Sequence, residues 1–191
     1  LMDQSLIGRW LFGAVALVVV PLALWVVGRS PLVNWIAWLL AVPAILLTLA
    51  GVASGQQDLL VASALLEACL YFYAAGGLIV YMLRDHHVSN DELFAAGATF
   101  TLLAWGFAYA YYVCQAWYPG SFTGFEPDRP RRWLELLFLS FTTLSGVSLG
   151  DVLPVGAQAR ALVMLEMLTG VGYLAMVVSR LIGLATLRGA R

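Results

Sequence analysis

The sequence predicts an all-α membrane protein with five transmembrane helices and one short re-entrant helix that leads into a loop. Three observations predict this class. Of the 191 residues, 62% are hydrophobic and only 11% are charged, and the mean hydropathy is +0.87. Several apolar segments are long enough to cross a bilayer, and one further apolar segment is too short to do so. A chain of this composition cannot cover its apolar surface in water, so we expect it to sit in lipid.

Charge and cysteine content argue against several other classes. The formal net charge is −1, so no basic surface for a nucleic acid is expected. All ten basic residues are Arg, which leaves no Lys for Schiff-base chemistry. Cys69 and Cys114 each lie inside an apolar segment, where a buried thiol is expected rather than a disulfide or a metal pair. We therefore expect no cofactor.

The transmembrane segments follow from the thickness of a bilayer, which requires about 20 apolar residues per helix. The windows that meet this requirement are residues 7–27, 35–53, 59–83, 93–118 and 159–187. Turn formers and charged residues separate these windows, as expected at a membrane surface. Asn90, Asp91 and Glu92 favour a helix start, because their oxygens can accept hydrogen bonds from free backbone amides.

The interval between the last two spans has a different character. Residues 133–144 are apolar but too short to span, which predicts a re-entrant helix. We expect the following run, residues 145–151, to be extended backbone. In lipid every backbone amide needs a partner, so such a run must be buried in protein or line a water-filled cavity. Several copies of the chain around a symmetry axis would supply that cavity.

The order of elements in residues 93–187 resembles the pore module of the tetrameric potassium channels. The matching segments are Ser-Phe-Thr-Thr-Leu at 140–144, in the pore helix, and Gly-Asp-Val-Leu-Pro at 150–154, at the outer mouth. The inner-helix stretch 160–184 looks particularly like the prokaryotic branch of this pore-loop cation channel superfamily. About half of the chain carries the resemblance.

The resemblance implies a homotetramer that crosses the cell inner (plasma) membrane several times. Residues 1–92 would form three peripheral helices, and residues 93–191 would form the pore module. The implied parts of the module are the outer helix 93–118, the turret 119–132, the pore helix 133–144, the filter 145–151 and the inner helix 159–187. The implied function is the passive movement of monovalent cations, potassium or sodium.

The filter departs from the family pattern. The family sequence Thr-Val-Gly-Tyr-Gly aligns on Gly146, Val147, Ser148, Leu149 and Gly150, so only the valine and the last glycine are kept. The implied ligands of a permeant cation are the backbone carbonyls of Gly146, Val147, Ser148 and Leu149. Gly146 lacks the hydroxyl of the family's threonine, and Leu149 lacks that of its tyrosine. We therefore expect altered or relaxed selectivity between potassium and sodium.

The same resemblance implies roles for residues around the filter. These are filter support for Thr142, Thr143, Ser145 and Glu166, the outer mouth for Asp151, and a gating hinge for Gly170. Three of these residues have an alternative role. Asp151 could cap local amides, Glu166 could line the pore, and Gly170 could serve close helix packing. We expect Glu166 to lie behind the filter, since a ring of facing charges would cost more than a neutral or hydrogen-bonded carboxyl.

Two other functions compete with a conducting channel. One is a non-conducting pore-loop scaffold or accessory subunit. The other is an intramembrane serine hydrolase, because residues 146–150 satisfy the pattern G-x-S-x-G. That chemistry would require a histidine within reach of Ser148, whereas the implied topology places His86 and His87 on the opposite side of the bilayer. We therefore expect no catalytic residue.

The sequence offers little on gating. Residues 59–83 contain no Arg, so they are not an arginine-bearing voltage sensor. No nucleotide-binding or calcium-binding motif is present, so we expect gating within the membrane or through an unidentified partner. Glu67 is expected to form a structural hydrogen bond to a neighbouring helix. His86 and His87 are expected to lie in a solvated turn, where they could titrate near neutral pH.

Overall fold

The structure is a computed structural model that describes residues 34–84, 90–126, 129–147 and 149–189. The predicted first span, residues 7–27, lies outside the described residues. His86, His87 and Ser148 also lie outside them.

The described residues confirm an all-α fold. The helices are α2 (Asn34–Ser54), α3 (Gln57–Arg84), α4 (Asn90–Trp117), α5 (Trp133–Leu144) and α6 (Ala157–Gly189). The strands β1 (Phe122–Thr123) and β2 (Leu153–Pro154) form one short antiparallel pair, in which Phe122 lies opposite Pro154 and Thr123 opposite Leu153. This pair joins the turret to the segment that follows the predicted filter.

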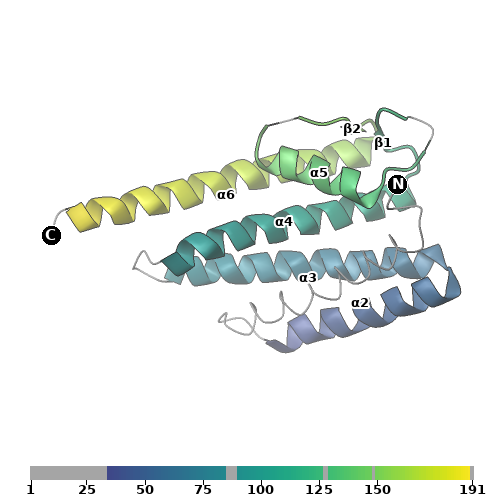
Figure 1. Ribbon diagram of the computed structural model, residues 1–191, viewed down its shortest axis with the longest axis horizontal. Helices are drawn as coiled ribbons and strands as arrows, with labels where there is room; N and C mark the ends of the chain where they lie inside the picture. Colours follow the sequence, from purple (N-terminus) through teal and green to yellow (C-terminus); the bar gives the residue numbers. More distant parts are fainter. Residues whose placement is uncertain (1–33, 85–89, 127–128, 148, 190–191) are drawn as a thin grey trace.

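The long helices lie side by side in chain order (Figure 1). α2 packs against α3, and α3 packs against α4. α6 runs along the other side of α4 and extends beyond it at its C-terminal end, while the short α5 contacts both α4 and α6. α4 is therefore the central element, with the peripheral helices on one side and the re-entrant segment on the other.

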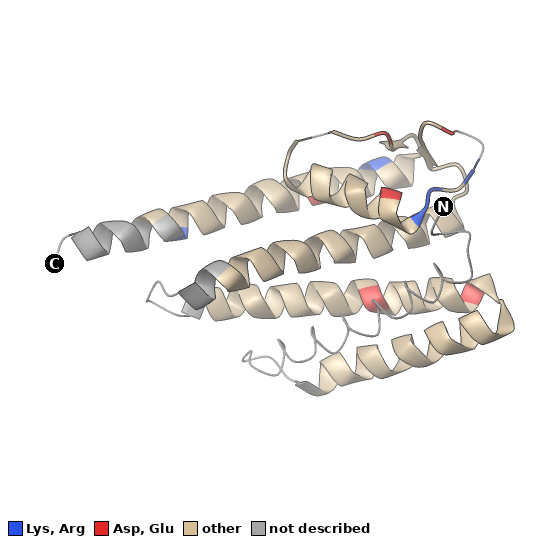
Figure 2. Cartoon of the chain, viewed as in Figure 1, with Lys and Arg blue, Asp and Glu red and all other residues tan. Residues whose placement is uncertain are grey.

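Length and composition support a membrane protein. In the described part of the chain, three helical segments are long and apolar enough to cross a bilayer: Trp35–Ser54, Gln57–Leu83 and Ala157–Arg180. α5 is apolar but shorter, as predicted for a re-entrant helix. The long helices are almost uncharged, and charged residues gather at the end that carries α5, β1 and β2 (Figure 2).

α4 differs from the other long helices in composition. It has 28 residues and is long enough to cross a bilayer, but it is not among the three most apolar segments. Its second half carries Trp105, Tyr109, Tyr111 and Tyr112, whose rings combine an apolar body with a polar group. These side chains suit a helix that is surrounded by other helices.

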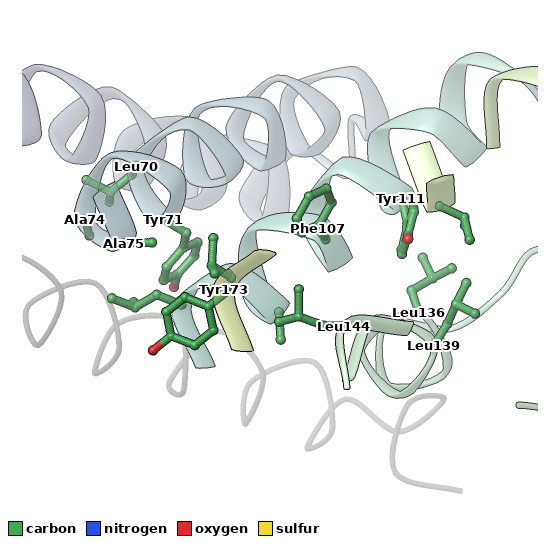
Figure 3. Packing of buried hydrophobic residues seen from close by; sticks show 14 of the residues in the cluster. Leu70, Tyr71, Ala74, Ala75, Phe107, Tyr111, Leu136, Leu139, Leu144 and Tyr173 are labelled. Atoms are coloured by element: carbon green, nitrogen blue, oxygen red, sulfur yellow. The ribbon is translucent and has the colours of Figure 1, made fainter. Parts of the chain in front are cut away.

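The core extends from α3 across α4 to α5 and α6 (Figure 3). Ala74 and Ala75 of α3 are fully buried, and such small residues let helix backbones approach closely. Aromatic rings continue the contact: Tyr71 stacks on Tyr109 at 5.5 Å, and Tyr109 lies 4.1 Å from Trp133 of α5, between ring centroids. One face of the re-entrant helix is thus packed on protein, while Leu134 and Phe138 on its other side are exposed in the single chain.

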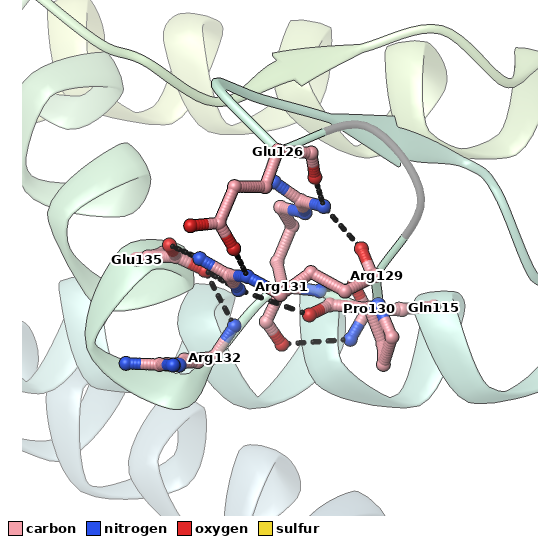
Figure 4. Close-up of polar contacts among 7 residues, drawn as sticks. All are labelled: Gln115, Glu126, Arg129, Pro130, Arg131, Arg132 and Glu135. Atoms are coloured by element: carbon pink, nitrogen blue, oxygen red, sulfur yellow. Dashed lines mark hydrogen bonds and ion pairs between the residues drawn. The ribbon is translucent and has the colours of Figure 1, made fainter. Parts of the chain in front are cut away.

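The turret is held to the end of α4 by a buried side chain. Gln115 accepts a hydrogen bond from the Arg131 backbone N–H at 2.6 Å, and its side-chain nitrogen donates to the Arg131 carbonyl oxygen at 3.0 Å (Figure 4). One Gln side chain therefore satisfies both backbone groups of Arg131, which precedes the N-cap residue of α5. This fixes where the re-entrant helix begins.

A second set of contacts holds the start of α5 itself. Arg129 donates to both carboxylate oxygens of Glu135, at 2.6 and 2.9 Å, and also pairs with Glu126 (Figure 4). Glu135 in addition accepts a hydrogen bond from the Arg132 backbone N–H at 2.7 Å. A carboxylate in the first helical turn also interacts well with the helix dipole. The hydrogen bond from Arg129 lowers the pKa of Glu135 to about 2.

We predict that Glu135→Gln lowers the stability of the protein at neutral pH, because it removes the ion pair at the start of α5. The loss should be about 1 kcal/mol, since the pair is partly exposed and screened by water. Because folding lowers the pKa of Glu135, its contribution is present above the ordinary value of 4.5 and is lost as the pH falls towards about 2. Thermal unfolding of the two proteins should therefore converge in acid.

The matched control is Glu126→Gln, which removes a more exposed partner of the same Arg129. Its effect should be smaller than that of Glu135→Gln. A difference between wild type and Glu135→Gln that stays constant through this pH range would contradict the role given to the ion pair.

Candidate functional site

The re-entrant helix ends in a turn at a glycine. Ser145 follows α5 with helical backbone angles, φ −76° and ψ −11°, and Gly146 has φ +73°. The Gly146 N–H donates to the Thr143 carbonyl and the Val147 N–H donates to the Thr142 carbonyl, each at 3.1 Å. This is the Schellman arrangement, in which a left-handed residue, usually Gly, satisfies the last carbonyls of a helix.

The expectation of extended backbone from residue 145 onward is wrong at its first two positions. Ser145 and Gly146 belong to the helix cap, because the carbonyls at the end of α5 need partners and a left-handed glycine supplies them with little strain. The non-helical strip that leaves the cap consists of Val147 and residues 149–151, and Ser148 between them lies outside the described residues.

The strip itself is exposed in the single chain. Val147 is 57% exposed and Leu149 is 67% exposed, and Gly150 and Asp151 are also exposed. Two large apolar side chains in one short exposed loop are unusual for a surface that faces only water. The strip therefore forms an accessible edge of the chain, next to the end of α5.

The chain returns from the strip along the turret. Val152 is buried, and the β1–β2 pair follows it. The Ser121 carbonyl then accepts hydrogen bonds from the backbone N–H groups of Val155, at 2.9 Å, and Gly156, at 3.1 Å. The strip is thus anchored at one end by the α5 cap and at the other by the turret.

Glu166 lies behind the re-entrant helix, at a junction of three helices. Its carboxyl is fully buried on the face of α6 that meets α4 and α5. One carboxyl oxygen accepts a hydrogen bond from the Tyr111 hydroxyl of α4, and the other is hydrogen-bonded to the Ser140 hydroxyl of α5. Ser140 also donates to the Ala104 carbonyl oxygen at 2.8 Å. Glu166 was predicted from the sequence to lie behind the filter, but its partner Tyr111 was not predicted.

The predicted supports Thr142 and Thr143 are both buried, yet they hold the strip through their backbones. The Thr142 hydroxyl donates to the Leu139 carbonyl at 2.9 Å, within α5. The carbonyls of Thr142 and Thr143 accept from Val147 and Gly146, and the Ser145 hydroxyl donates to the Thr142 carbonyl at 3.2 Å. The helix end, rather than a set of hydroxyls, therefore positions the first residues of the strip.

Gly170 lies in the middle of α6, which is an uninterrupted helix. A Cβ atom at Gly170 would overlap the backbone of Leu144, with the Leu144 carbonyl carbon only 2.9 Å away. Glycine is thus needed here for α6 to touch the last residue of α5. This contact supports the packing role for Gly170, and a hinge at the same position stays a prediction.

The face of α6 opposite Gly170 is exposed in the single chain. Met164, Leu165, Leu168 and Val171 are between 54% and 72% exposed. They follow one another at spacings of one, three and three residues, which places them on one side of the helix. α6 therefore has one face packed against its own chain and one apolar face that the described chain leaves uncovered.

Titratable side chains form no metal site in the described residues. Within residues 34–84, 90–126, 129–147 and 149–189, no group of three or more His, Cys, Asp and Glu side chains could hold a metal ion. Cys69 and Cys114 are free thiols there; Cys114 is buried as expected, whereas the expectation of burial is wrong for Cys69, which is exposed in the single chain. Glu67 is buried and accepts a hydrogen bond from Thr48 of α2 at 3.3 Å, a contact of the kind expected for it.

Comparison with known protein families identifies the class of protein. A family model described as an ion channel matches residues 68–186, which run from α3 to α6 and make up more than half of the chain. The chain therefore belongs to this ion channel family, the family of pore-loop potassium channels. Comparisons with curated proteins and with solved structures gave no match. An ion channel is not an enzyme, so the hydrolase hypothesis for residues 146–150 is set aside.

We predict that Gly170→Ala destabilises the protein, because the new methyl group would push α6 away from the backbone of Leu144. Overpacking of this kind costs about 1–3 kcal/mol. The measurement is thermal unfolding of the purified protein in detergent.

The matched control is Gly172→Ala, two residues further along α6, where a Cβ would meet no atom of the chain within 4 Å. This change should be neutral or slightly stabilising, since Ala favours a helix over Gly by about 1 kcal/mol. Equal losses in the two variants would show that the contact with Leu144 is not the cause.

Proposed function

We propose that the protein is a passive cation channel in which four identical chains surround one pathway. The observation that carries this proposal is the exposed strip after a short re-entrant helix, inside the segment that matches the ion channel family. The proposed ligands of the permeant monovalent cation are the carbonyls of Gly146, Val147, Ser148 and Leu149. Asp151 would add a ring of carboxylates at the outer mouth.

The direction of α5 favours cations near the strip. The C-terminal end of a helix carries a partial negative charge, and α5 ends directly before the strip. Some of its last carbonyls are satisfied by the cap at Gly146, so the helix end is stable without a cation present. Four such helix ends around one axis would lower the energy of a partly dehydrated cation.

A ring of chains would also account for two uncovered surfaces. Non-helical backbone at membrane depth is tolerated only where protein buries it or where it lines water. Neighbouring chains in a head-to-tail ring could cover the strip on one side and the apolar face of α6 on the other. In this arrangement residues 7–27 and α4 would complete five spans of a multi-pass protein of the cell inner (plasma) membrane.

We further propose that the filter discriminates only weakly between potassium and sodium. Gly146 has no side-chain oxygen to add to the carbonyl ligands, and its left-handed backbone belongs to the helix cap. Leu149 has no hydroxyl with which to tie the strip to α5. A filter with fewer oxygen ligands and fewer tethers would adapt to both ions, because selectivity depends on the number and stiffness of the coordinating dipoles.

We predict that the purified protein in liposomes conducts potassium and sodium at rates within about tenfold of each other, which corresponds to about 1.4 kcal/mol. The double variant Ser148→Gly and Leu149→Tyr should raise the ratio of potassium to sodium flux, because it restores two residues of the family pattern. The measurement is ion flux under potassium, sodium and impermeant-ion gradients.

Each outcome of this experiment decides between named alternatives. Strong potassium selectivity in the wild-type protein would contradict the proposed weak selectivity. Absence of flux in both forms would overturn the channel proposal and favour a non-conducting scaffold or accessory subunit. Flux that appears only when a second protein is added would identify a gating partner.

A further inference from the structure

The chemical state of Glu166 can be inferred from its surroundings. Its carboxyl is 0% exposed and lies in an apolar helix. In the part of the chain that the structure describes, Glu166 has no ion pair, because the ion pairs found there join Arg129 to Glu126 and Glu135. A buried carboxylate without a positive partner is unfavourable, whereas a neutral carboxylic acid with hydrogen bonds is tolerated.

A count of hydrogen atoms leads to the same state. The Ser140 hydroxyl oxygen lies within hydrogen-bonding distance of two oxygens, the Ala104 carbonyl and one Glu166 carboxyl oxygen. A backbone carbonyl can only accept, and a serine hydroxyl carries one hydrogen. If Ser140 donates to Ala104, the hydrogen between Ser140 and Glu166 must come from Glu166.

The other carboxyl oxygen has a different partner. The Tyr111 hydroxyl donates to it. The hydrogens then run in one direction, from Tyr111 through Glu166 and Ser140 to the Ala104 carbonyl. Each hydroxyl in this series of hydrogen bonds uses its single hydrogen once, so each donor around Glu166 has an acceptor.

We propose that Glu166 acts as a neutral carboxylic acid that donates to Ser140 and accepts from Tyr111, and that it is a positioning residue which locks α4, α5 and α6 together behind the filter. One helical turn further along α6, Gly170 touches the backbone at the end of α5. The inner helix is thus joined to the re-entrant helix at two successive turns. The consequence for conduction rests on the proposed channel function, but the state of Glu166 does not.

Other titratable groups near this carboxyl are weak acids. α4 contributes Tyr111 and, one turn away, Cys114, and α5 contributes the hydroxyl of Ser140. The charged group of α5, Glu135, lies at its opposite end and pairs with Arg129. No described cation is therefore placed to hold Glu166 as a carboxylate.

Infrared spectroscopy tests this state directly. At neutral pH the wild-type protein should show the carbonyl stretch of a buried, protonated carboxyl, and this band should be lost in Glu166→Gln. The matched control is Glu67→Gln, which removes another buried carboxyl and should leave the Glu166 band in place. A wild-type spectrum at neutral pH without a protonated carboxyl band assignable to Glu166 would overturn the proposal.

Thermal unfolding provides an independent test. A glutamine amide can donate to Ser140 and accept from Tyr111, so Glu166→Gln should unfold within about 2 °C of the wild-type protein. Glu166→Ala leaves both partners unsatisfied and should unfold at least about 5 °C lower. If Glu166→Gln is as unstable as Glu166→Ala, the residue works as an acceptor on both oxygens and the proposal is wrong.

Flux in liposomes separates this inference from the proposed function. In a conducting protein, Glu166→Gln should keep the wild-type ratio of potassium to sodium flux, whereas Tyr111→Phe and Ser140→Ala should change it. Unchanged ratios in these two variants would overturn the positioning role. Absence of flux in the wild-type protein would instead be a failure of the channel proposal, because neither the infrared band nor the unfolding temperature depends on conduction.

Discussion

The structure depends on one constraint, that lipid offers no hydrogen-bond partner to a polypeptide backbone that leaves a helix. The chain meets this constraint at three points around the strip after α5. At the turn on Gly146, two backbone N–H groups donate to carbonyls at the end of α5. After the strip, the Ser121 carbonyl accepts from two further backbone N–H groups, and in the turret Gln115 satisfies both backbone groups of Arg131. Each end of the strip is therefore tied to a helix or to the turret, and its described residues, Val147 and 149–151, are exposed in the single chain.

Much of the fold could be predicted from the sequence, because apolar windows and the turn formers between them limit where helices can lie. The predicted re-entrant helix, residues 133–144, coincides with α5, and the predicted spans 59–83 and 159–187 differ from α3 and α6 by one or two residues at each end. The composition of α4 was harder to interpret. Its aromatic residues serve contacts with α3 and α5, and such contacts arise only after the helices have packed.

The candidate site was less predictable. Thr142 and Thr143 were expected to support the filter, but a residue type does not reveal whether its hydroxyl or its carbonyl makes the contact. The turn at Ser145 and Gly146 caps the end of α5. The alignment with Thr-Val-Gly-Tyr-Gly does not reveal this turn, because it treats Gly146 as the first residue of the filter. Tyr111 could not have been paired with Glu166 from sequence, since the two residues are 55 positions apart and meet only through the packing of α4 against α6.

The buried Gln115 has a consequence for how the bilayer would act on the proposed outer mouth. It binds the turret to the last turns of α4, and the turret in turn holds the segment after the strip through β1, β2 and Ser121. The segments before and after the strip are therefore both tied to α4 through the turret. In the proposed channel, a change in membrane thickness that tilts α4 would move the segments beside the strip separately from any movement of the inner helix, and lipid composition would then be a second means of control over the opening.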